Sequence, residues 1–327
     1  MGAESIAMLS RVADNLYWMS RYLERAEHTA RILDVNLNLM LDESATNVDR
    51  RWERVLAALG NPPNLAWSGD AYQVAQVLTF DASNRSSITS CITAARENAR
   101  QVREEISSEQ WQRVNRLFHQ VAHYNLTESL DVLPSEFLLN VIEGVHLFQG
   151  VTDSTMSHGE GWHFIQVGRY IERASATTNL LNLYHKEFWG QAGSTPEGNE
   201  YLEWVGLLRS CTAFEAYCKA YSADLNPDQI LEFLLLNPEF PHSVRYSIDC
   251  LQSALDAIHG EGGKRRAAPL TRLAGRLQAS LGFGQISEIL SEDVGSYLQG
   301  ILHQCRDIHV MIYELYVNYS IQAALAG

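Results

Sequence analysis

The sequence predicts an all-α protein, a multi-helix bundle, and three observations support this. Apolar residues recur at alternating steps of three and four along most of the 327 residues, the spacing of one helical face. No segment shows the sustained alternation of a β-strand. One charged tract also occurs twice, as Arg-Tyr-Leu-Glu-Arg-Ala from Arg21 and as Arg-Tyr-Ile-Glu-Arg-Ala from Arg169. The repeat predicts an internal duplication of a Glu-Arg helix.

Start and stop signals place the helices in order. Asn61-Pro62-Pro63-Asn64 ends the second helix, and Ser86 or Ser87 is the expected N-cap of a helix whose apolar stripe begins at Ile88. A polar loop at 190–199 is the expected boundary between a helical lobe at 1–190, which carries both Glu-Arg copies, and a second lobe at 200–327, the two packed as one continuous unit. Helices are expected at about 5–42, 48–59, 71–79, from 86 or 87, 111–124, 135–152, from 159–161, 200–221, 227–235, 242–258, 267–281 and 293–324.

Both copies of the repeat are predicted to pack on two sides. The apolar stripe of the first copy includes Leu16, Leu23 and Ala30, while its charged residues share the opposite side with Tyr17 and Trp18. Glu24 is expected to be sheltered between Arg21, Arg25 and His28, and a sheltered carboxylate between guanidinium groups stays ionised and fixed, so the motif could orient a ligand. Glu24 and Glu172 are predicted to point toward a common region. The alternative is a solvated face, because Arg and Glu three or four apart on a helix usually form exposed pairs that contribute roughly 0.2–0.5 kcal/mol.

Composition and charge exclude several classes of protein. The formal net charge is −14 and the longest basic run is Lys264-Arg265-Arg266, so a surface for nucleic acid or an anionic membrane is not expected. No apolar stretch is long enough to cross a bilayer and the first residues lack a signal-peptide pattern, which predicts a cytoplasmic protein. The five cysteines form no Cys-x-x-Cys, so we expect no disulfide framework, no zinc and no cofactor.

Two Glu-x-x-His pairs offer a metal-binding alternative. Glu143 with His146, and Glu160 with His163, each match half of a di-iron carboxylate bundle. Ser157-His158-Gly159 interrupts the helix between the two pairs, so they are not expected to face each other. Motifs for a serine nucleophile, a phosphate-binding loop or a catalytic cysteine are absent from the sequence.

The tract from Arg96 to Arg100 is predicted to complete a site with the two Glu-Arg helices. Arg96, Arg100 and Arg103 follow one face of their helix, next to its apolar stripe. Three neighbouring cations repel one another unless carboxylates or an anionic ligand neutralise them. Glu24 or Glu172 could supply that charge.

Several tracts together resemble a known family. They are Asn15 to Glu27, Ser86 to Arg100, Gly161 to Ala174, Arg209 to Tyr217 and Phe240 to Arg245, and they cover nearly the whole chain. They resemble the bacterial alpha-E domain family, whose Glu-Arg motif falls here on Glu24-Arg25 and Glu172-Arg173. The resemblance implies two partners, a circularly permuted ATP-grasp ligase and a transglutaminase-like protein. It implies no reaction for the domain itself.

Two functions remain open at this point. The first is a binding and partner module of an ATP-grasp peptide or amide ligase system, which holds an acidic amino acid or peptide through guanidinium groups. The second is a stand-alone enzyme in which Glu24 or Glu172, assisted by His28, acts as general acid or base on a peptide-like substrate. The candidate ligand-binding residues are Tyr17, Arg21, Glu24, Arg25, Arg96, Glu97, Arg100, Arg169, Glu172 and Arg173.

Overall fold

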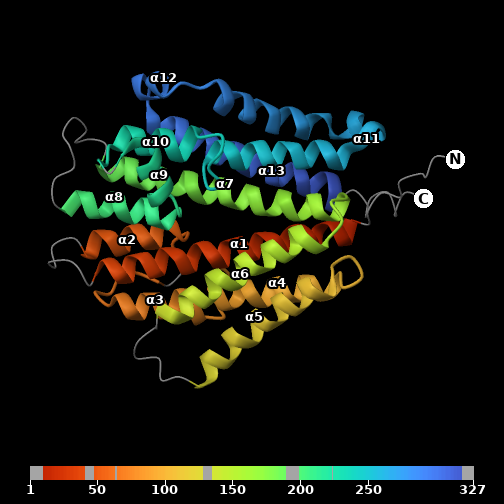
Figure 1. The fold of residues 1–327 in the computed structure, drawn as a ribbon, viewed down its shortest axis with the longest axis horizontal. Helices are drawn as coiled ribbons and strands as arrows, with labels where there is room; N and C mark the ends of the chain where they lie inside the picture. Colours follow the sequence, from red (N-terminus) through yellow and green to blue (C-terminus); the bar gives the residue numbers. More distant parts are fainter. Residues whose placement is uncertain are drawn as a thin grey trace.

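The computed structural model describes residues 10–40, 48–62, 65–127, 135–188, 199–222 and 224–318, and within these ranges every regular element is a helix (Figure 1). This confirms the predicted all-α class. None of these helices is both long and apolar enough to cross a membrane. In order they are α1 (Ser10–Leu39), α2 (Val48–Ala58), α3 (Ala71–Phe80), α4 (Ile88–Gln101), α5 (Ser108–Thr127), α6 (Ser135–Thr155), α7 (Glu160–Phe188), α8 (Asn199–Ser210), α9 (Phe214–Tyr221), α10 (Pro227–Leu236), α11 (Val244–Phe283), α12 (Ile286–Ser291), α13 (Val294–Tyr313) and a π-helical turn (Glu314–Asn318).

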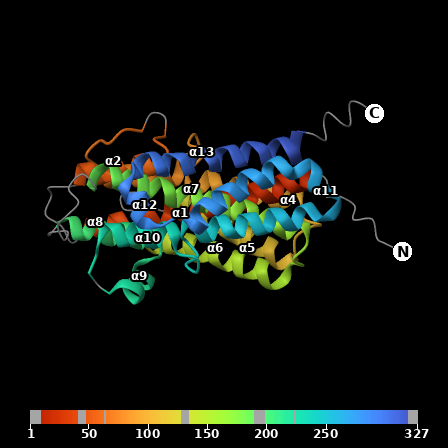
Figure 2. The same cartoon turned by 90° about the horizontal axis from the view of Figure 1, so that it is seen from above.

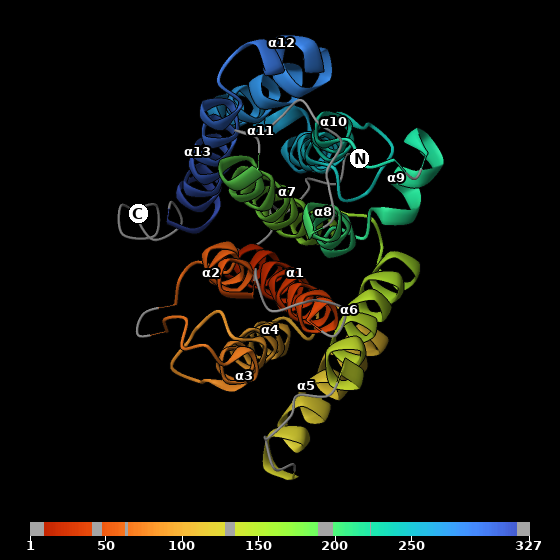
Figure 3. The same cartoon turned by 90° about the vertical axis from the view of Figure 1, so that its left-hand side faces the viewer.

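The helices that carry the two Glu-Arg motifs, α1 and α7, lie side by side at the centre of the bundle (Figure 3). α1 also packs on α4 and α6, and α7 packs on α11 and α13. Most helices run along the long axis of the molecule, and α9 lies at its edge (Figure 2). Buried apolar side chains form one cluster that extends through both predicted lobes. The predicted boundary loop lies largely outside the described residues, so the division into lobes stays a prediction.

A glycine sets the close approach of the two central helices. A Cβ atom at Gly168 of α7 would lie 2.3 Å from the main-chain oxygen of Tyr17 in α1, so only glycine fits. The helices are parallel, because contacts between them keep a nearly constant separation in sequence: Arg21 meets Glu172 and Glu24 meets Arg173. The two motifs therefore lie at the same level of the two helices, and the carboxylate of each meets an arginine of the other.

The helix predicted at 200–221 is divided in the structure into α8 and α9. Thr212 has φ 55°, and the amide of Ala213 donates to the carbonyl of Leu208 at 2.7 Å while that of Thr212 donates to Arg209 at 3.0 Å. This is a Schellman termination, in which the left-handed position is usually glycine. Because threonine stands there, the sequence did not signal the break.

The helices predicted at 242–258 and 267–281 are the two arms of α11, which is folded back on itself (Figure 1). The Gln278 side-chain amide donates to Asp249 at 2.9 Å, although the two residues are 29 apart in the chain. A straight helix would separate them by roughly 43 Å at 1.5 Å per residue. Pro269 lies within this helix and removes one of its main-chain donors.

Candidate functional site

The carboxylate of the second motif is bound by both arginines of the first. Glu172 on α7 accepts hydrogen bonds from Nε of Arg21 at 2.7 Å and from Nε of Arg25 at 2.6 Å. Burial raises the pKa of Glu172, but the charges of Arg21 and Arg25 outweigh that effect and lower it to about 2. The carboxylate is therefore ionised and its oxygens are occupied.

The carboxylate of the first motif is bound less symmetrically. Glu24 on α1 is 3% exposed, and one oxygen accepts from Nε of Arg173 at 2.5 Å. The other oxygen accepts from the Gln149 amide of α6 at 3.0 Å, while Nε of Arg169 stays 3.9 Å away. We call these six side chains, Arg21, Glu24, Arg25, Arg169, Glu172 and Arg173, the cross-paired cluster.

The cross-paired cluster confirms that the two carboxylates point toward a common region, but it corrects the expected pairing. Glu24 was expected between Arg21, Arg25 and His28 of its own helix, and its partners instead come from α7 and α6. The reason is the close approach of the helices at Gly168, which brings arginines of one motif within reach of the carboxylate of the other. Side chains three or four apart on one helix compete poorly with such direct contacts.

A small cavity lies between the carboxylates of the cluster. Its volume is about 20 Å³, which is room for about one water molecule. Glu24, Glu172, Arg173, His28 and His242 are among its lining residues. Burial lowers the pKa of both histidines, so at neutral pH they are uncharged. An amino acid or peptide does not fit in this space.

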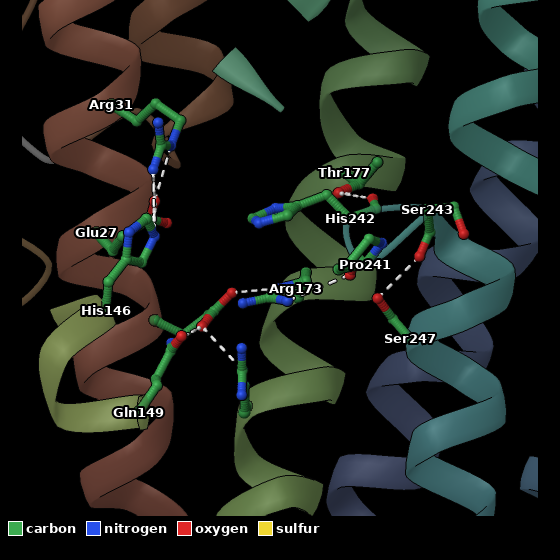
Figure 4. Close-up of polar contacts among 12 residues, drawn as sticks. Glu27, Arg31, His146, Gln149, Arg173, Thr177, Pro241, His242, Ser243 and Ser247 are labelled. Carbon is green, nitrogen blue, oxygen red and sulfur yellow. Dashed lines mark hydrogen bonds and ion pairs between the residues drawn. The ribbon is translucent and has the colours of Figure 1, made fainter. Parts of the chain in front are cut away.

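A second carboxylate of α1 extends the polar interior (Figure 4). Glu27 accepts from Nε of Arg31 at 2.7 Å and lies 3.5 Å from the ring nitrogen of His146 on α6. Burial opposes its ionisation, yet contact with His146 and the charge of Arg31 lower its pKa. Arg173 reaches from the cluster to the main-chain oxygen of Pro241 at 3.2 Å, in the segment before α11. Polar contacts in the interior thus involve four elements, which are α1, α6, α7 and the segment before α11.

Tyr17 is buried, away from this cavity. Its hydroxyl donates to Nδ1 of His309 on α13 at 2.8 Å, and Arg21 donates to the same nitrogen at 3.0 Å. An arginine can only donate, so Nδ1 carries a lone pair and the ring is neutral. Burial, together with the charge of Arg21, lowers the pKa of His309 to about 4. Tyr17 therefore serves to position Arg21.

Arg96, Glu97 and Arg100 do not join the cluster, which corrects the prediction made for them. Arg96 donates to Asn115 of α5 at 2.8 Å and to Glu97 at 3.1 Å. Arg100 donates to Glu97 at 2.9 Å on an exposed surface. The apolar stripe of α4 packs on α1, so Arg96 turns toward α5 while Glu97 and Arg100 pair on the surface of α4.

An open groove lies beside the cluster, between α6, α7 and the segment that leads into α11. Its volume is about 790 Å³, within the usual range of ligand sites. Gln149 and Arg169, two of the side chains nearest Glu24, form part of its lining. The groove therefore reaches the cluster from the outside.

Sequence reasoning missed a second buried ion-pair cluster. Arg51 of α2, fully buried, donates to Glu203 of α8 at 3.0 and 2.6 Å. Arg54 pairs with Glu203 and with Glu187 of α7, and its guanidinium lies 4.3 Å from the centre of the Tyr184 ring. The available signal was the position of both arginines beside the apolar face of a short helix.

The metal alternative gains no support from the described residues. Among them, no three His, Cys, Asp or Glu side chains are grouped closely enough to bind a metal ion. His146 lies beside Glu27, while His163 packs edge-on against Trp162. The five cysteines are free thiols.

The fold and the cross-paired cluster define an all-helical domain organised around two buried Glu-Arg motifs. Residues 8–317 match the Alpha-E family, described as a predicted alpha-helical domain with a conserved ER motif, and the chain belongs to that family. Similar curated proteins include uncharacterised proteins of Mycobacterium bovis, 26% identical, and Mycobacterium tuberculosis, 25% identical, in alignments over 287 residues. Each alignment covers 81% of this chain but 32% of the relative, so the chain spans about a third of the length of these relatives. No solved structure shows significant similarity.

Proposed function

We propose that this chain is a binding and partner module of an ATP-grasp peptide or amide ligase system, and that it binds a carboxylate-bearing amino acid or peptide in the groove. One observation carries the proposal. Arg21 and Arg169 occupy the same position of the two motifs, yet Arg21 bonds directly to Glu172 while Arg169 makes no direct hydrogen bond to a carboxylate among the described residues. Arg169 instead lines the groove with 23% of its side chain exposed.

The other arginines of the cross-paired cluster have a structural role and are not free to bind a ligand. Arg21, Arg25 and Arg173 are each bonded to a carboxylate, so their charge is already neutralised. A ligand carboxylate would have to displace a buried partner to reach them, at a cost of several kcal/mol. Arg169 has no such direct partner, because Gln149 occupies the second oxygen of Glu24.

The partner role draws support from the family and its relatives. The resemblance to alpha-E proteins implies a circularly permuted ATP-grasp ligase and a transglutaminase-like protein as partners. In the mycobacterial relatives the matched region is one part of a much longer chain. Such a region can work beside a further domain, which is consistent with a module that binds and presents a substrate.

The stand-alone enzyme is less well supported. A carboxylate whose pKa is about 2 accepts protons poorly at neutral pH, which makes Glu172 a weak general base. Glu24 has both oxygens engaged by Arg173 and Gln149. His28 lines the cavity of about 20 Å³, where a substrate does not fit.

The test is to purify the chain and the neighbouring ligase separately and together, and to screen amino acids and acidic peptides for ATP-dependent amide formation by mass spectrometry. We expect product only when both proteins are present. Equal activity of the ligase alone would contradict the partner role, and product from the chain without ATP would favour the stand-alone enzyme.

A further inference from the structure

The charged side chains that line the groove differ in how closely they are paired with other side chains. Asp249 accepts from Gln278 at 2.9 Å and lies 3.9 Å from Arg245, and Asp153 lies 3.7 Å from His158. Asp249 therefore has a hydrogen-bond partner, whereas Asp153 is 70% exposed to solvent. Arg169 is the arginine of the lining, and its Nε lies 3.9 Å from Glu24 and has no hydrogen-bond partner among the described residues.

An aromatic ring lies beside that cation, and further rings line the groove. The guanidinium of Arg169 lies 5.3 Å from the centre of the Tyr170 ring, which contacts Tyr246 of α11 edge-on at 6.1 Å. Trp162 and Pro241 also line the groove. Beside such walls water screens charge poorly, so a guanidinium attracts a carboxylate strongly and can bind it with two parallel hydrogen bonds.

We infer that the groove binds the amine-donating substrate of the ligation by its carboxylate, and leaves the amine of that substrate free to react. This rests on the proposed function and specifies which of the two substrates the chain binds. An ammonium group beside Arg169 would be repelled, so the amine must point away from it. A carboxylate bound to Arg169 is also shielded from phosphorylation.

The two steps of an ATP-dependent ligation use the carboxylate of one substrate and the amine of the other. In an ATP-dependent ligation the carboxylate of the other substrate attacks the γ-phosphorus of ATP, giving an acyl phosphate and ADP. The amine of the groove-bound substrate then attacks the acyl carbon. The new C–N bond forms, the C–O bond to phosphate breaks, phosphate leaves with that electron pair, and the amine loses one proton. The carboxylate at Arg169 takes no part in these steps.

Binding to the isolated chain tests the first half of the inference. The common L-amino acids and their Ala-X dipeptides are screened by calorimetry, and the tightest binder is measured again as its N-acetyl and C-amide derivatives. Amidation should weaken binding about ten- to a hundredfold, because it removes a charge-assisted contact, while acetylation should change it little. Absence of carboxylate-dependent binding across the panel would overturn the inference.

Substitutions locate the contact. Arg169→Gln should lose the same ten- to hundredfold, and Arg169→Lys should retain part of the affinity because it keeps the charge without the planar fork. Arg276→Gln, at an exposed position of α11, is the matched control and should bind normally. Glu24 keeps Arg173 and Gln149 in the Arg169 variants, so their melting temperatures should stay close to that of the wild type. Normal binding by Arg169→Gln would overturn the assignment.

An isotope label separates this inference from the proposed function. The binder is labelled with heavy oxygen at both carboxylate positions and used in the ligation with the partner ligase. An amine donor keeps both heavy oxygens in the product, and the released phosphate stays unlabelled. Transfer of one heavy oxygen to phosphate would refute the inference while leaving the partner role intact. Absence of any ATP-dependent amide with both proteins present would refute the proposed function itself.

Discussion

Arg173 of α7 donates its Nε hydrogen to Glu24 of α1 at 2.5 Å, and each side chain is only 4% exposed. The two residues come from different copies of one motif, 149 positions apart. Two buried charges of opposite sign stabilise the fold little relative to apolar residues, but removing one of them leaves the other without a partner. The motif therefore fixes how α1 and α7 are aligned more than it adds to the free energy of unfolding.

Glu24→Ala should lower the free energy of unfolding by about 3–5 kcal/mol, because Arg173 would remain buried and unpaired. Urea denaturation measures this. Glu97→Ala is the matched control, since that glutamate is 46% exposed and should cost less than about 1 kcal/mol. Equal urea midpoints for the two variants would show that the Glu24 pair is not coupled to folding.

Gly168→Ala should destabilise the protein, although alanine is favoured over glycine inside a helix by about 1 kcal/mol. The new Cβ would lie 2.3 Å from the Tyr17 carbonyl oxygen, so α1 and α7 would have to separate. Gly275→Ala on α11 meets nothing within 4 Å and should stabilise by up to about 1 kcal/mol. Thermal melting of the two variants should thus give shifts of opposite sign, and shifts of the same sign would contradict the close helix contact.

Stability should fall as the pH decreases from about 6.5 to 4. The pKa of His309 is lowered to about 4, so in this window the unfolded chain takes up a proton that the folded chain does not. In His309→Gln the free energy of unfolding should change less with pH, because glutamine does not titrate. Urea titrations at several pH values decide the matter, and identical slopes would argue against a neutral His309.

A second decline in the stability of the fold is expected at lower pH. The pKa of Glu172 is lowered to about 2, so its pairing with Arg21 and Arg25 stabilises the fold above about pH 4.5 and is lost as the pH falls toward 2. NMR titration of the glutamate carboxyl carbons measures this pKa directly. A midpoint near the ordinary glutamate value would contradict the buried pairing.

Glu203→Ala should be as destabilising as Glu24→Ala, by about 3–5 kcal/mol, because Arg51 and Arg54 both depend on this carboxylate. Glu215→Ala, at an exposed position of α9, is the control and should cost less than about 1 kcal/mol. Comparable midpoints in urea for the two variants would show that the contacts of α2 and α8 contribute little.

Local signals were sufficient to predict much of the fold. α3, α4 and α10 begin where Asp70, Ser87 and Asn226 accept hydrogen bonds from the first turn, as N-caps do. The apolar stripes of α1 and α4 are buried as their periodicity predicts. The position of two matched motifs on two long helices also predicted that Glu24 and Glu172 would face a common region.

The contacts between helices could not be predicted from the sequence. Which arginine meets which carboxylate depends on the rotation of each helix and on the separation that Gly168 permits, and a single sequence encodes neither openly. Arg96 was assigned to the site because three neighbouring cations called for more negative charge than their own helix supplies, yet Asn115, Trp111 and Phe118 of α5 contact it. Arg169 likewise stays 3.9 Å from Glu24 beside Gln149, which lies on a third helix and bonds the same oxygen.

The cross-paired cluster also bears on the order in which the chain assembles during translation. Its carboxylates and guanidinium groups come from positions 149 residues apart, so α1 leaves the ribosome long before α7 exists. At typical synthesis rates the interval is roughly 7–30 s. Until then Arg21, Glu24 and Arg25 must remain hydrated, and the face of α1 that packs on α7 stays uncovered. Docking of α7 on α1 therefore cannot begin until more than half of the chain has been synthesised.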